Sequence, residues 1–73
     1  MEFTEGDIFY TIIENKYHLH KVLKVDHDFN TYHVLGYAPA EKLPDPEKVT
    51  ELSVFIYHFP IDKNGFENPV LFT

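Results

Sequence analysis

The chain has 73 residues, a hydrophobic content of 44% and a formal net charge of −6, and it contains no cysteine. We therefore expect one domain over residues 1–73 whose small core relies on seven phenylalanines and five tyrosines, because disulfides and thiolate metal sites are excluded. All basic side chains are lysines, and the lack of an Arg/Lys cluster argues against nucleic acid as a partner.

We expect neither a secretory signal nor a membrane partner. The first seven residues are acidic rather than cationic, and no apolar run approaches the roughly 20 residues that span a bilayer. The chain is therefore predicted to be cytoplasmic.

The first two strands are predicted on either side of a short polar break. Residues 8–14 form the first strand, and Asn15 suits a hairpin loop in a left-handed conformation. The second strand, residues 17–26, has the clearest alternation in the chain. Its odd positions are predicted to face inward, and these are Tyr17, Leu19, Lys21, Leu23 and Val25.

A third strand at residues 31–38 completes an antiparallel meander. Gly36 within it indicates a β-bulge or the close approach of another segment. The charged, proline-rich residues 39–51 form the longest connection. In that connection Asp45 as N-cap and Pro46 at the first helical position predict one helical turn near residues 46–50.

Residues 52–61 are predicted to be the central strand of the core, closed by Pro60. Alternation would divide its side chains between two apolar faces, with Phe55, Tyr57 and Phe59 on one and Val54, Ile56 and His58 on the other. One of these faces must be covered by residues 39–51, by the C-terminal strand or by a partner. Cover within the chain is favoured, because a small domain needs that area for its own stability.

The chain is predicted to finish with a hairpin. Asn64 and Gly65 are its strongest hairpin signal, and residues 66–73 would form a fifth strand that Pro69 confines to an edge. The apolar end indicates a final strand, an edge covered by a second copy, or a longer protein truncated at residue 73.

These elements predict a mainly β fold: a small five-stranded antiparallel SH3-like barrel or roll with one short helical turn near residues 46–50. The alternative is an α+β fold in which the segment around Asp45 packs across one face of the sheet.

Histidines are the residues most suggestive of a metal site. His18 and His20 share one face of the second strand, and such a pair chelates zinc when a neighbouring strand supplies a third ligand. His33 and His58 are the candidates for that ligand, although the expected register sets His33 opposite Leu23, on the other face. The competing interpretation is a pair of solvent-facing histidines.

We expect neither catalysis nor a cofactor. Ser53, the one serine, opens a core strand, and no glycine-rich loop precedes a helix. Asp26 and Asp28 flank His27, but in a short turn aspartates are expected to cap backbone N–H groups.

The first third of the chain resembles small bacterial SH3-like domains of the immunity-protein and uncharacterised-family type. A glycine-aspartate-hydrophobic strand, a tyrosine after the turn and a valine-leucine pair carry the resemblance, at Gly6, Asp7, Phe9, Tyr17, Val22 and Leu23. The resemblance implies a β-barrel domain that binds another protein and has no catalytic residues.

The sequence as a whole predicts a domain for protein–protein contact, with another protein or as a homodimer. The expected surface is an aromatic strand face flanked by acidic residues, comprising Phe55, Tyr57, Phe59, Tyr37, Glu47 and Glu51. The alternatives are a metal-binding domain using His18 and His20, and a carrier of a small ligand.

Overall fold

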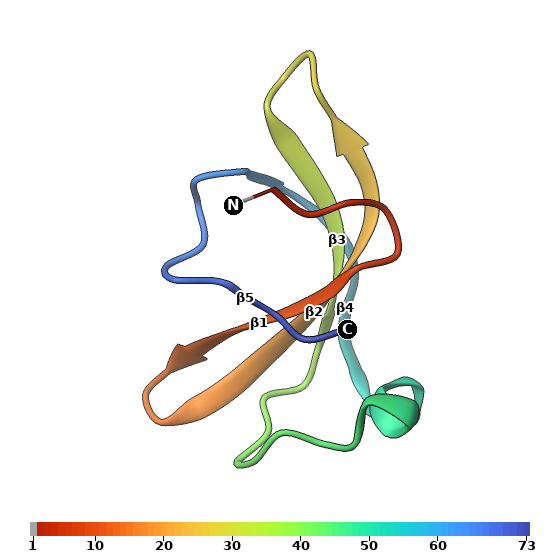
Figure 1. Cartoon of the computed structure of the whole chain (residues 1–73), viewed down its shortest axis with the longest axis vertical. Helices are drawn as coiled ribbons and strands as arrows, with labels where there is room; N and C mark the ends of the chain where they lie inside the picture. The colour runs from red at the N-terminus through yellow and green to blue at the C-terminus, as the bar shows by residue number, and fades with distance from the viewer. Residues whose placement is uncertain (1) are drawn as a thin grey trace.

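The computed structural model describes residues 2–73 and forms one antiparallel sheet of five strands with one 3₁₀ helix (Figure 1). The elements along the chain are β1 (Ile8–Ile13), β2 (Lys16–Asp26), β3 (Thr31–Tyr37), η1 (Pro46–Glu51), β4 (Val54–Asp62) and β5 (Val70–Leu71). The strands lie side by side in the order β4-β3-β2-β1-β5, so β4 and β5 are the two edges. The predicted mainly β, five-stranded antiparallel architecture is confirmed. In this described part of the chain, no helix has the length and apolar character that crossing a bilayer requires.

A two-residue loop joins β1 to β2. Ile13 pairs with Lys16, and between them Glu14 and Asn15 have φ angles of 52° and 65°. Positive φ at both central residues is typical of a type I′ turn, whose twist matches that of the flanking strands. The left-handed conformation of Asn15 is confirmed, and Glu14 adopts it too.

The pairing of β2 with β3 contains a bulge. The register shifts between Val22 and Lys24, which leaves Leu23 as the extra residue. Lys24 therefore lies opposite His33, and the prediction that Leu23 would do so is wrong, because alternation alone does not reveal a bulge.

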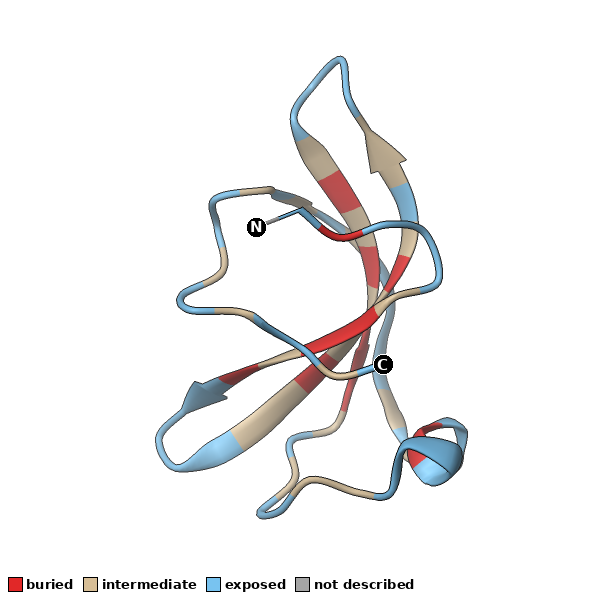
Figure 2. Ribbon diagram, viewed as in Figure 1, coloured by how far each residue is buried: buried red, intermediate tan, exposed pale blue. Residues whose placement is uncertain are grey.

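Buried residues lie along the middle of the strands (Figure 2), and the core they form has two clusters, one on each face of the sheet. The first cluster consists of Phe3, Phe9, Val22, Tyr32 and Val34, with Val25, Phe59, Ile61 and Phe66 packed against it. The second consists of Ile8, Leu19, Tyr37 and Val49, with Tyr10, Tyr17, Leu35, Leu43, Leu52, Val54 and Phe72 around it. Leu19 and the even-numbered Val22 are thus both buried, at 0% and 1% exposure. The prediction that the odd side of β2 faces inward is therefore incomplete, because each face of this strand meets a cluster.

The connection between β3 and β4 covers the second cluster. Its helix η1 confirms the predicted helical turn, with Asp45 at the N-cap position and Pro46 in the first turn. The Asp45 side chain makes no capping hydrogen bond. Val49 of η1 is 1% exposed, and Leu43 and Leu52 pack beside it. This cover comes from within the chain, but of β4 it reaches only Val54, and Phe55, Ile56 and Tyr57 stay exposed, so the in-chain cover favoured from the sequence is confirmed only in part.

β4 departs from regular alternation at two places. The pairs that bracket the shifts are Tyr37–Val54, Gly36–Ile56 and Val34–Phe59. Between Tyr37–Val54 and Gly36–Ile56, the chain advances two residues along β4 but one along β3. Between Gly36–Ile56 and Val34–Phe59, it advances three residues along β4 but two along β3. Each extra residue is a β-bulge. The expected division of β4 into two regular faces is therefore wrong: Phe59 packs against the first cluster, whereas Phe55 and Tyr57 are exposed.

The last segment crosses to the opposite edge of the sheet. A turn forms as predicted, because Asp62 accepts hydrogen bonds from the backbone N–H of Asn64 (2.9 Å, to Oδ1) and of Gly65 (2.8 Å, to the carbonyl). However, β5 pairs with β1 rather than β4, so the predicted hairpin between the last two strands is wrong (Figure 1).

Candidate functional site

Three consecutive residues of β4 expose large apolar side chains. Phe55 is 72% exposed, Ile56 40% and Tyr57 78%; we call these three residues the β4 patch. The two bulges in this part of β4 interrupt the alternation that would have returned these side chains to a core. β4 is an edge strand, so the prediction that residues 52–61 form the central strand is wrong. Within residues 2–73 no further strand pairs along its outer side.

The other predicted binding residues fall into two groups. Glu47 and Glu51 are exposed on η1, directly before β4. Tyr37 is 7% exposed in the second cluster, and burial raises the pKa of its hydroxyl. Phe59 is half-buried against the first cluster. Tyr37 and Phe59 therefore pack in the two core clusters and are not part of the exposed β4 patch.

Pro60 lies within β4 rather than ending it, and its imide nitrogen points away from β3. The backbone N–H of Lys63 donates to the Asn30 carbonyl at 2.9 Å, toward β3. The pairing of β3 with β4 is regular from this hydrogen bond to the His33–Pro60 pair. The backbone N–H groups of successive residues point to opposite sides of a strand. The Pro60 nitrogen, three residues away, therefore faces the outer edge. Proline at such a position leaves that part of the edge without an N–H donor.

His20 lies among three phenylalanine rings of the first face. Its ring centroid is 5.3 Å from that of Phe9, 5.9 Å from Phe59 and 5.0 Å from Phe66. Its Nδ1 atom is buried and has no hydrogen-bond partner among the described residues. Burial lowers the pKa of His20 to about 4, and the neighbouring His18 acts in the same direction. The ring is therefore neutral at physiological pH.

Gly36 makes room for this histidine. A Cβ atom at Gly36 would lie 3.3 Å from the Phe59 ring and 3.5 Å from Cδ2 of His20. The predicted close approach at Gly36 is confirmed, whereas the bulges that flank its pairing with β4 have their extra residues on β4 rather than at Gly36.

The four predicted metal candidates divide between the two faces of the sheet. His18 and His20 share a face with Phe9, as expected. His33 and His58 contact each other instead, with Nδ1 and Nε2 2.9 Å apart and ring centroids at 5.1 Å. Among residues 2–73 no group of three His, Cys, Asp or Glu side chains is placed to hold a metal ion. A metal site at His18 and His20 thus stays a prediction.

The turn after β2 confirms the role expected for Asp26. Its carboxylate accepts hydrogen bonds from the backbone N–H groups of Asp28 and Phe29, at 3.1 and 3.2 Å. His27, in the same turn, instead lies beside Lys63, with 3.5 Å between its Nδ1 and Nζ.

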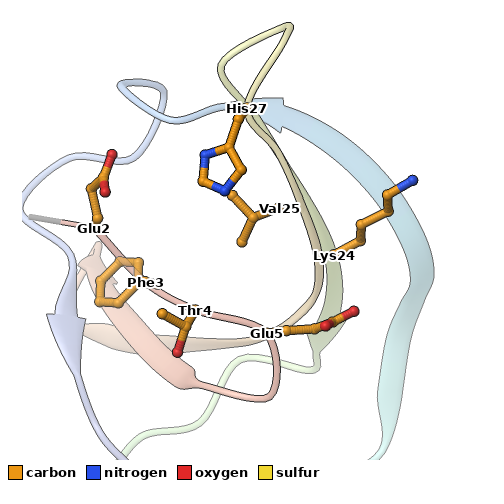
Figure 3. Close-up of a pocket in the computed structure, with 7 residues that line it drawn as sticks. All are labelled: Glu2, Phe3, Thr4, Glu5, Lys24, Val25 and His27. Atoms are coloured by element: carbon orange, nitrogen blue, oxygen red, sulfur yellow. The ribbon is translucent and has the colours of Figure 1, made fainter.

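A pocket of about 420 Å³ lies between the N-terminal segment and the end of β2 (Figure 3). Its lining residues are Glu2, Phe3, Thr4, Glu5, Lys24, Val25 and His27. Figure 3 shows Glu2 and Phe3 on one side, with Val25 and His27 opposite them.

Lys63 lies beside this pocket, and sequence reasoning missed it. Its side chain is only 9% exposed, and Nζ is 3.6 Å from the Glu2 carboxylate and 5.5 Å from the centroid of the Tyr32 ring. The Tyr32 hydroxyl in turn accepts a hydrogen bond of 2.8 Å from the backbone N–H of Phe3. Lys63 and His27 are 36 residues apart in sequence, so no local pattern could have linked them.

Comparisons of the chain with protein-family models, with curated proteins and with solved structures find no match.

Proposed function

We propose that this chain is a protein-binding domain whose contact surface is the β4 patch. The observation that carries the proposal is the exposure of Phe55 and Tyr57, at 72% and 78%, on an edge strand. Adjacent exposed aromatic side chains supply large contact area at low conformational cost, and they are enriched at the centres of protein interfaces.

Charge favours a basic partner. The chain carries a net charge of −6, Glu47 and Glu51 are exposed beside the start of β4, and Asp62 is exposed at its end. Lysine or arginine side chains of a partner would meet these carboxylates, whereas a second copy of the chain would itself carry a net charge of −6. The occupant we propose is therefore an extended basic segment of another protein, with apolar side chains that contact the β4 patch.

The mode of contact we propose is strand addition along the first half of β4. An extended segment that pairs with an exposed sheet edge gains affinity from main-chain hydrogen bonds and specificity from its alternate side chains. The missing donor at Pro60 restricts such pairing to residues 54–58, the part of β4 that contains the patch.

We further propose that the fold is an open relative of the SH3-like barrel. The strand order β4-β3-β2-β1-β5 and the strong bend of the sheet support this interpretation (Figure 1). So does the resemblance at the N-terminal strand and turn, centred on Gly6 and Asp7. Such barrels are small binding domains, in agreement with the proposed role.

Fluorescence anisotropy with a labelled peptide of alternating lysine and valine tests the function. We expect binding that weakens with added salt and falls about tenfold in Phe55→Ala and in Tyr57→Ala, because each loses an aromatic anchor. Ile13→Ala is the matched control, since Ile13 is 51% exposed on another strand, and it should bind like the unmodified chain.

Two results would contradict the proposal. One is undiminished binding by folded Tyr57→Ala. The other is a dimer in light scattering that Tyr57→Ala dissociates, which would make a second copy the occupant of the patch.

A further inference from the structure

We propose that the pocket beside Lys63 binds the carboxylate of a small organic acid. The apolar body of the acid would lie against Phe3, which is 3% exposed, and against the half-buried Val25. The volume of about 420 Å³ is in the range of pockets that hold small molecules. This site is separate from the β4 patch and does not depend on it.

The ammonium group of Lys63 provides the charge for an anion. Its side chain is 9% exposed, so the group has lost most of its hydration, and a buried ammonium is costly unless an anion and hydrogen bonds compensate. The contacts within the described chain are long: 3.5 Å to Nδ1 of His27 and 3.6 Å to the Glu2 carboxylate. The Tyr32 ring at 5.5 Å adds only a cation–π attraction. An incoming carboxylate oxygen would complete the hydrogen bonding of this ammonium.

His27 provides a second donor. The Lys63 ammonium can only donate, so Nδ1 of His27 is the acceptor in their contact. A neutral imidazole that accepts at Nδ1 carries its proton on Nε2, and that N–H can donate to a ligand. The Nε2–H lies on the side of the ring away from Nδ1 and Lys63, so it would donate to a second polar group of the ligand rather than to the same carboxylate.

Glu2 holds the place that the ligand would take. Its carboxylate is 78% exposed while it contacts Lys63 at 3.6 Å. An ion pair with one exposed partner is weak, so an external carboxylate can displace Glu2 into solvent. Glu5 and Lys24, also in the lining, carry opposite charges.

NMR titration with benzoate at neutral pH, following the resonances of His27 and Phe3, tests the site. We expect saturable shifts with a dissociation constant of about 1 mM, and none with benzyl alcohol, which has a similar shape but no charge. Lys63→Met should weaken binding about tenfold or more, because it removes the charged donor. Glu2→Gln should strengthen it about threefold, because it removes the competing carboxylate. Lys48→Gln, at an exposed lysine of η1, should change nothing.

The absence of benzoate-induced shifts at His27 and Phe3 would overturn the proposal. Unaltered affinity in folded Lys63→Met would do so as well. If Lys63→Met does not fold, the Glu2→Gln variant decides. If Glu2→Gln binds benzoate no more tightly than the unmodified chain does, the proposal that the ligand displaces the Glu2 carboxylate is wrong. Phe55→Ala should leave benzoate binding intact, so this test and that of the β4 patch can fail separately.

Discussion

At the scale of single residues, His20 is the side chain whose chemistry bears most directly on stability. Three phenylalanine rings surround its imidazole, and Nδ1 is buried without a partner in the described chain. The ring favours the neutral form in this place, because burial would strip an imidazolium of its hydration and a backbone hydrogen bond with His18 offsets only part of that loss.

Stability should therefore fall in mild acid. The pKa of His20 is about 4 in the folded chain and 6.5 for the ordinary group, so between these pH values the unfolded chain binds the proton more readily. The free energy of unfolding should be fully developed above about pH 6.5, decrease as the pH falls, and lose at most about 3 kcal/mol by pH 4. Urea unfolding at a series of pH values measures this slope.

A pair of variants identifies the residue responsible. His20→Leu should remove most of the slope, whereas Lys48→Gln, at an exposed lysine of η1, should keep it. The same slope in His20→Leu and in the unmodified chain would show that other groups cause the acid sensitivity.

Gly36 is the second residue at which the packing predicts a clear effect of substitution on stability. Gly36→Val would place its Cβ 3.3 Å from the Phe59 ring and 3.5 Å from His20, with methyl groups closer still. We expect a loss of about 1–3 kcal/mol in urea unfolding. In a His20→Ala background the loss should shrink, because the truncated side chain opens space. An equal loss in both backgrounds would contradict this packing.

At the scale of elements, the first hairpin has a turn that its sequence does not suit well. Glu14 and Asn15 both have positive φ, which asparagine tolerates and glycine favours, whereas glutamate does neither. Changing the pair to Asn-Gly should raise the free energy of unfolding by about 0.5–1 kcal/mol. Lys16→Gly, one residue into β2, should lower it by a similar amount. Thermal unfolding compares the variants, and an Asn-Gly variant that is no more stable would argue against this turn type.

Local elements were predictable because their signals lie within a few residues. Asn15 and Asp26 identified two turns through their own chemistry, and Pro46 located η1. The bulges at Leu23 and in residues 54–58 were not predictable, because alternation assumes an unbroken ladder. The pairing of β5 with β1 was missed for a related reason: the Asn-Gly turn after β4 gives no information on the strand that the chain next reaches.

The candidate sites were predictable in part. Exposed aromatic residues on the fourth strand were expected, and Phe55 and Tyr57 are exposed. Tyr37 and Phe59, from the same prediction, pack into the core instead, because the bulges decide which rings leave it. The pocket at Lys63 and His27 depends on contacts between distant turns, which a single sequence does not reveal.

At the scale of the whole molecule, the two faces and the two edges of the sheet have different roles. Both faces are covered by the chain's own segments, the first by Phe3 and Phe66 and the second by the connection that contains Val49. What is left for a partner is therefore an edge rather than a face. Of the two edges, β4 presents three large exposed side chains, two of them aromatic, in a strand of nine residues, whereas β5 has two residues, Val70 and Leu71, both exposed.

The most direct test of the account is an amide map of the bound state. Backbone ¹⁵N–¹H spectra recorded during titration with the alternating lysine–valine peptide locate the contact without mutation. We predict that the largest shifts fall on residues 54–58 and that amides at the outer edge of this segment become protected from hydrogen exchange. Shifts that are largest on β5 and β1, or that spread evenly over the acidic surface, would contradict the proposed role of the β4 patch.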